Sequence, residues 1–75
     1  MLDDDLVTRG DQLYREGHLE AALAAYDTAL RRDPWSPQAL CGKALVFRQL
    51  GAGDQARAAL MAASAAVGYK RRRWA

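Results

Sequence analysis

Few residues in this chain could do chemistry, and they stand far apart. Histidine occurs once, as His18, and cysteine occurs once, as Cys41. No second histidine or cysteine stands at metal-ligand spacing from either residue, so the sequence does not predict a metal site. It also does not predict a catalytic pair of a nucleophile and a general base. We interpret His18 as a solvated turn residue that follows Gly17, and Cys41 as a small apolar filler.

Two further segments could bind ions. Asp3-Asp4-Asp5 offers three carboxylates, but acidic residues before an apolar run are typical of a helix N-terminus, where they interact with free N–H groups. Gly51-Ala52-Gly53 joins two predicted helices and does not follow a strand, so a phosphate-binding loop is not indicated. The sequence therefore predicts no catalytic, cofactor-binding or metal-binding residues, and a protein that is not an enzyme.

The 75 residues have room for one small domain. Hydrophobic residues make up 51% of the chain, which argues against disorder, but many are alanines that bury little area, so we expect marginal stability. No apolar run approaches the roughly 20 residues of a membrane span. The acidic N-terminus resembles neither a secretory signal nor a transit peptide, and a single cysteine cannot form an internal disulfide. These features predict a cytoplasmic protein.

Positive charge is concentrated near the C-terminus. Residues 1–69 contain seven lysine or arginine residues and nine aspartate or glutamate residues, and the basic tail Lys70-Arg71-Arg72-Arg73 turns this net −2 into an overall +2. Because Tyr69 and Trp74 flank the basic tail, it could bind single-stranded nucleic acid by charge and stacking. Solubility, or complementarity to a helix C-terminus, explains four basic residues about as well. An adaptor for nucleic acid or an acidic partner is therefore the alternative function.

Break signals along the chain predict four helices. Gly17 and Gly51-Ala52-Gly53 suit turns, Asp33-Pro34 ends a helix, and Ser36-Pro37 reads as an N-cap followed by proline at the first helical position. With Gly68 as a further stop, the predicted helices cover about residues 4–16, 19–32, 37–50 and 54–67, with an Asp27–Arg31 pair on the outside of the second. The chain is thus predicted to be all-α.

A second pattern links the two halves of the chain, because residue types recur at one fixed offset. Six pairs are identical at that offset, namely Leu6/Leu40, Gly17/Gly51, Ala22/Ala56, Ala24/Ala58, Ala25/Ala59 and Ala29/Ala63. Gly10 and Ala44 match in size, and since glycine in a helix costs about 1 kcal/mol, we expect a second helix to approach closely there. A fixed period of this length is typical of a helical repeat array.

These residues and their spacing resemble tetratricopeptide repeats. The first unit, about residues 3–36, carries the family's pattern as Leu6, Gly10, Leu13, Gly17, Ala22, Tyr26, Ala29 and Pro34. The second unit, about residues 37–70, carries it as Leu40, Ala44, Phe47, Gly51, Ala56, Leu60 and Ala63. Leu13 and Leu60 depart from the aromatic residues of the family, and Gly68 departs from its terminal proline.

The resemblance implies two helix-turn-helix repeats, that is, four antiparallel helices in a short right-handed solenoid over residues 1–69. It also implies a protein–protein interaction module, a scaffold or adaptor that binds another protein or a peptide, without a cofactor and without a membrane. Residues 70–75 then form a basic tail. Trp74 stands in register with Leu40, so the tail could also begin a third repeat.

By the same resemblance, the first helix of each repeat lines a concave groove that holds an extended peptide. The groove positions carried over are Asp4, Val7, Thr8, Asp11, Tyr14, Arg15, Gln38, Cys41, Leu45, Arg48 and Gln49. An ordinary solvated face is the alternative, but Val7, Tyr14 and Leu45 are not required by the core pattern. Asp4 and Asp11 favour a peptide with basic residues. The chaperone-binding branch of the family is not expected, because Val7, Asp11 and Gly42 stand where its lysine and asparagine residues would.

Two repeats leave the outer side of the fourth helix without cover, because repeat arrays bury their core by stacking. This helix carries no charge from Ala58 to Val67, and its alanines would allow close approach of another helix. We therefore expect the chain to form a homo-oligomer. The predicted self-association residues are Leu60, Met61, Val67 and Trp74.

Overall fold

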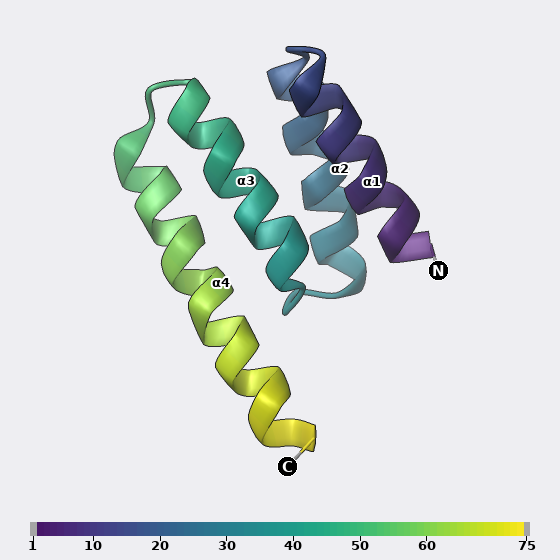
Figure 1. Cartoon of the computed structure of the whole chain (residues 1–75), viewed down its shortest axis with the longest axis vertical. Coiled ribbons are helices and arrows are strands. Elements are labelled where there is room, and N and C mark those ends of the chain that lie inside the picture. The colour runs from purple at the N-terminus through teal and green to yellow at the C-terminus, as the bar shows by residue number, and fades with distance from the viewer. Residues whose placement is uncertain (1, 75) are drawn as a thin grey trace.

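The computed structural model of the chain describes residues 2–74, and the side chains of residues 6–69. Four α-helices follow one another in this part of the chain: α1 (Leu2–Arg15), α2 (Leu19–Arg32), α3 (Pro37–Gln49) and α4 (Gly53–Trp74). Consecutive helices run in opposite directions, so that α1 and α2 form one hairpin and α3 and α4 form a second (Figure 1). The predicted all-α architecture of two helix-turn-helix units is confirmed.

The turns follow the expected chemistry. Gly17 and Gly51 have φ angles of 86° and 78°, the left-handed region that only glycine enters without a steric penalty. At the start of α3, the hydroxyl of Ser36 accepts a hydrogen bond of 3.3 Å from the backbone N–H of Ala39, and Pro37 occupies the first helical position. Glycines at equivalent positions therefore form the turn of each hairpin. The predicted N-cap, Ser36, starts the first helix of the second hairpin.

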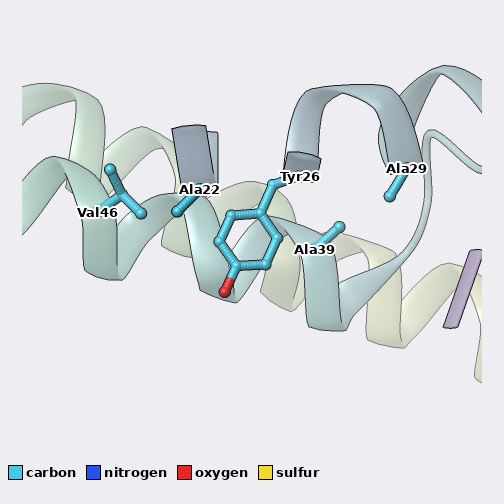
Figure 2. Packing of buried hydrophobic residues seen from close by; sticks show 5 residues of the cluster. All are labelled: Ala22, Tyr26, Ala29, Ala39 and Val46. Carbon is cyan, nitrogen blue, oxygen red and sulfur yellow. The ribbon is translucent and has the colours of Figure 1, made fainter. Parts of the chain in front are cut away.

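Helix packing is sequential. Helix α2 contacts both α1 and α3, α1 also touches α3, and α4 contacts α3 alone among the described helices. The most buried cluster lies between α2 and α3 and consists of Ala22, Tyr26, Ala29, Ala39 and Val46. Figure 2 shows the ring of Tyr26 pointing from α2 toward the helix that carries Ala39 and Val46. The core is thus built from small residues around a single large ring.

Two glycines make room for the ring of Tyr26. A Cβ atom placed on Gly10 of α1 would come within 2.7 Å of the ring, and one on Gly42 of α3 would overlap it more severely. The expected close approach at Gly10 is therefore confirmed, although the group that approaches is a side chain of α2 and not its backbone. Sequence reasoning does not assign this role to Gly42. Ala44, the repeat partner of Gly10, is also buried, as expected.

The end of α4 differs from the prediction. The sequence predicts a stop at Gly68, but α4 continues without a turn to Trp74 and extends beyond the start of α3 (Figure 1). Glycine only lowers helix propensity, whereas Pro34 at the equivalent position of the first repeat removes a backbone donor and ends α2. Tyr69 then stacks on Trp35, with ring centroids 4.8 Å apart, which fixes the extended helix against the loop between the repeats.

The inward face of α4 also differs. Its buried residues are Ala56, Ala59, Ala63 and Ala66, whereas Leu60, which the repeat pattern groups with Ala56 and Ala63, is 52% exposed. Only the alanine side of α4 faces α3, and no described helix covers the side that carries Leu60.

The starts of two helices also differ slightly from the prediction. Helix α1 begins at Leu2, so Asp3-Asp4-Asp5 lies within its first turn instead of capping it. Helix α4 begins at Gly53, one residue before the predicted start, so Asp54 lies in its first turn. Acidic residues in the first turn still suit the positive end of the helix dipole.

Candidate functional site

The residues with catalytic potential remain apart in the structure. His18 is exposed beside the turn after α1, as predicted. Cys41 is also exposed, so its interpretation as an apolar filler is wrong. Among the described residues, no group of three or more histidine, cysteine, aspartate or glutamate side chains could hold a metal ion. Over the same residues, no helix is long and apolar enough to cross a membrane.

The predicted groove positions lie on α1 and α3, which are neighbours in the array. Those with exposed side chains are Thr8, Asp11, Arg15, Gln38, Cys41, Leu45, Arg48 and Gln49. Leu45 is 40% exposed and adds an apolar side chain to this set. The side chain of Asp4 lies outside the described residues. The two helices thus offer a continuous set of accessible polar groups with one accessible leucine.

Val7 and Tyr14 contribute to the core, although the sequence pattern predicts that the core does not require them. Both are half-buried and pack against the cluster around Tyr26. On a helix with only 3.6 residues per turn, the residue beside a core position shares part of its contacts, so the core and the groove positions overlap. These two residues therefore have a structural role whatever they bind.

Tyr14 and Gln49 join the two repeats at one end of the face. The side-chain amide of Gln49 donates a hydrogen bond of 3.4 Å to the hydroxyl of Tyr14, although the residues are 35 positions apart. A shallow pocket with a volume of about 320 Å³ lies beside this contact, lined by Tyr14, Arg15, Gly17, Leu19 and Gln49. A pocket with aliphatic, aromatic, amide and guanidinium walls could take a side chain of a bound peptide.

Tyr26 connects the core to the same face. Its hydroxyl donates a hydrogen bond to the carboxylate of Asp11, one of the predicted groove residues. Burial, followed by this hydrogen bond and the negative charge of Asp11, raises the pKa of Tyr26 well above the usual value near 10. Tyr26 therefore stays neutral at physiological pH and remains a donor to Asp11.

The face carries charges of both signs. Asp11 lies one turn before Arg15 on α1, and Arg48 lies on α3 close to Gln49 in sequence. The described groove side chains carry one carboxylate and two guanidinium groups. With Asp4 included, the formal charges cancel, so any preference for a basic peptide depends on local contact with Asp11 and not on net charge.

An ion pair that the sequence does not predict links α2 to α3. The helical spacing predicts that Asp27 pairs with Arg31 on its own helix, but its carboxylate lies 2.8 Å from the ammonium group of Lys43. Lys43 also lies over the ring of Phe47, 5.7 Å from its centroid. Pairing across helices is not visible in the sequence, because only the packing of α3 on α2 brings position 43 to position 27.

The structure describes the side chains of three of the four predicted self-association residues of α4. Leu60, Met61 and Val67 are exposed, with Met61 67% exposed, and none of them belongs to the buried alanine side of α4 that faces α3. The side chain of Trp74 lies outside the described residues. The side chains of the basic tail, Lys70 to Arg73, do as well, but its aromatic neighbour Tyr69 is already stacked on Trp35.

Leu19 and Gly17 are not among the predicted site residues, although both line the pocket beside Tyr14. The sequence assigns Gly17 only to the turn, and Leu19 only to the start of a helix. The position of Gly17 after Tyr14 could have indicated that the turn borders the groove. Nothing in the spacing of Leu19 indicates this.

The structure therefore defines a short array of two helical hairpins whose first helices carry an accessible face. Comparison with known families agrees with this class: the sequence profile described as TPR repeat matches residues 10–63, more than half of the chain. The chain belongs to the TPR repeat family, whose members bind other proteins or peptides and are generally non-catalytic scaffolds. Neither a curated protein nor a solved structure matched the chain significantly.

Proposed function

We propose that this chain is a protein–protein interaction module that binds an extended peptide on the face formed by α1 and α3. The observation that carries the proposal is the pocket beside the Tyr14–Gln49 contact, because it joins the groove positions of both repeats at one place. Leu45 adds an accessible apolar contact, and Arg48 adds charge on the same helix. A peptide that spans α1 and α3 would contact Tyr14, Leu45 and Arg48.

The groove can be tested with two similarly exposed leucines, one within α3 and one at its C-cap. Peptides selected from a displayed library of random sequences serve as the probe. Leu45→Ala is expected to weaken their binding about tenfold, because losing a contact of roughly 1.5 kcal/mol changes affinity by that factor. Leu50→Ala, at a residue that is 48% exposed but outside the groove positions, is expected to leave binding unchanged. Titration calorimetry measures both.

Equal loss in the two leucine variants would contradict the proposed groove. Tyr14→Ala should also weaken binding, but Tyr14 packs partly against the core, so the far-ultraviolet circular dichroism of this variant must first match that of the parent. Because Asp11 is the carboxylate of the described groove, selected peptides are expected to carry a basic residue, and Asp11→Asn should reduce that preference. Selection of peptides without basic residues would remove this part of the proposal.

A second proposed property is self-association through α4. It is supported by the exposure of Leu60, Met61 and Val67 on a side of α4 that no described helix covers. Apolar side chains that gather on an exposed surface are typical of protein–protein interaction sites. We expect the parent chain to elute as a dimer or a larger assembly at micromolar concentrations.

Leu60→Glu tests self-association directly, because it places a charge in the middle of the exposed apolar side of α4. Gel filtration with light scattering should give a mass well above 8.2 kDa for the parent and a mass near 8.2 kDa for Leu60→Glu. Since Leu60 is more than half exposed, the variant should remain folded, which circular dichroism checks. A parent mass of 8.2 kDa at every concentration would contradict self-association.

The alternative function, an adaptor for nucleic acid or an acidic partner through the basic tail, has less support. Tyr69 already stacks on Trp35, so a base would have to compete with Trp35 for that face of its ring. Loss of binding only when Lys70 to Arg73 are replaced, together with a steep salt dependence of binding to a single-stranded oligonucleotide, would favour this alternative. The cytoplasmic location predicted from the sequence stays a prediction.

A further inference from the structure

The two repeats of this chain allow the exposed side of α4 to be compared with a side of α2 that is already covered. The offset between the repeats maps Tyr26 and Asp27 of α2 onto Leu60 and Met61 of α4. Tyr26 is 1% exposed because α3 packs over it, and Asp27 pairs with Lys43 of α3. Leu60 is 52% exposed. The side of α4 that carries Leu60 is therefore the one on which a further helix would pack.

The same comparison shows which side of α1 would serve as that helix in a second copy. Helix α3 meets α2 with residues that include Gly42, Lys43 and Val46. Their counterparts on α1, one repeat earlier, are Thr8, Arg9 and Gln12, all exposed and all polar. Stacking α1 of one copy on α4 of another would thus remove Arg9 and two further polar side chains from water opposite Leu60 and Met61, which offer them no hydrogen bond. Head-to-tail stacking of copies is disfavoured.

Helix α4 itself offers a better match for a second α4. Its outward residues Leu60, Ser64 and Val67 follow one another at helical spacing, with Met61 beside them, and no charged residue occurs from Ala58 to Val67. Ser64 stands near the middle of this outward stripe, which consists of Leu60, Met61, Ser64 and Val67. Among the described helices, α4 contacts α3 alone, and Leu60, Met61 and Val67 of the stripe are exposed.

We infer that two copies of this chain associate through α4 alone, with the two α4 helices antiparallel about a two-fold axis near Ser64. This inference rests on the proposed self-association and specifies its geometry. A two-fold contact uses the same patch on both copies, so it buries the apolar stripe of each and leaves the polar side of α1 in water. It closes at two copies, whereas contact between α4 and α1 would continue into longer assemblies.

Disulfide formation distinguishes the two geometries. The native thiol is first removed by Cys41→Ser, and Ser64→Cys is then introduced into this background. At a two-fold axis, position 64 of one copy meets position 64 of the other within the roughly 7 Å between Cα atoms that a disulfide tolerates. We expect mild oxidation to convert most of this protein into a covalent dimer of twice 8.2 kDa, seen by non-reducing electrophoresis and mass spectrometry.

Arg9→Cys in the same Cys41→Ser background is the matched control, because Arg9 is exposed on the polar side of α1. It should form covalent dimer at least about tenfold more slowly than Ser64→Cys, by chance collision alone. Adding Leu60→Glu to Ser64→Cys should lower the rate to that of the control. These results together support the two-fold contact.

Two outcomes would overturn the inference in different ways. If the parent is oligomeric but Ser64→Cys oxidises no faster than the control, while a mixture of Ser64→Cys and Arg9→Cys forms the mixed disulfide rapidly, then copies stack head to tail. Self-association would then stand and the two-fold geometry would fall. If the parent has a mass of 8.2 kDa at all concentrations and no variant cross-links faster than the control, both fall.

Discussion

Tyr26→Ala is expected to unfold the domain. The ring is 1% exposed and is the largest fully buried side chain among the described residues, with Gly10 and Gly42 as its neighbours on α1 and α3. Removal of a buried aromatic ring typically costs about 3–5 kcal/mol, and a single core of this size rarely supplies more than that in total. Urea titration followed by far-ultraviolet circular dichroism should show little helix at room temperature even without urea.

Tyr26→Phe is the control that separates the ring from its hydroxyl. It keeps the packing and removes the hydrogen bond to Asp11, whose carboxylate is exposed and can bind water instead, so we expect a loss of about 1 kcal/mol. Equal losses in the two variants would show that the hydrogen bond, and not the ring, holds the repeats together.

The parent and Tyr26→Phe should also differ in their response to alkaline pH. Because folding raises the pKa of Tyr26, its contribution to stability is complete below the unfolded pKa near 10 and falls as the pH rises above it. The parent should therefore lose its advantage over Tyr26→Phe as the pH rises from about 10 to about 11, which urea titrations at each pH measure.

Much of the fold could be predicted because local chemistry and the repeat agree. Gly17 and Gly51 adopt the left-handed conformation of a helix C-terminus, and Ser36-Pro37 supplies an N-cap and a first helical residue. The end of α4 could not be predicted in this way. Gly68 permits both a stop and a continuation, and the helix continues beside a stack between Tyr69 and Trp35, which stand far apart in the sequence.

The candidate site could be predicted less completely than the fold. The repeat pattern identifies the helices that form the face, and these helices carry the expected accessible residues, including Leu45. It does not show that Tyr14 packs on the core as well as bordering a pocket, or that Leu19 lines that pocket. Such contacts depend on the angle between successive hairpins, which the sequence of one helix does not determine.

Gly42→Ala is expected to destabilise the domain, although alanine is the better helix former. A Cβ atom at this position would overlap the ring of Tyr26, which is buried and also lies close to Gly10, so it has little room to shift. Overpacking of this kind typically costs about 1–3 kcal/mol, which outweighs the roughly 1 kcal/mol that alanine gains over glycine in a helix. Thermal unfolding followed by circular dichroism should show a lower midpoint than the parent.

Gly68→Ala provides the matched control for Gly42→Ala. Gly68 also lies within a helix, but a Cβ atom there would meet nothing within 4 Å. This substitution should stabilise the chain by up to about 1 kcal/mol through helix propensity alone. In a Tyr26→Leu background, whose smaller side chain leaves space, Gly42→Ala should lose most of its cost, because residues in contact do not contribute independently. Equal shifts for the two glycine variants in the parent would show that Tyr26 does not fill the space between α1 and α3.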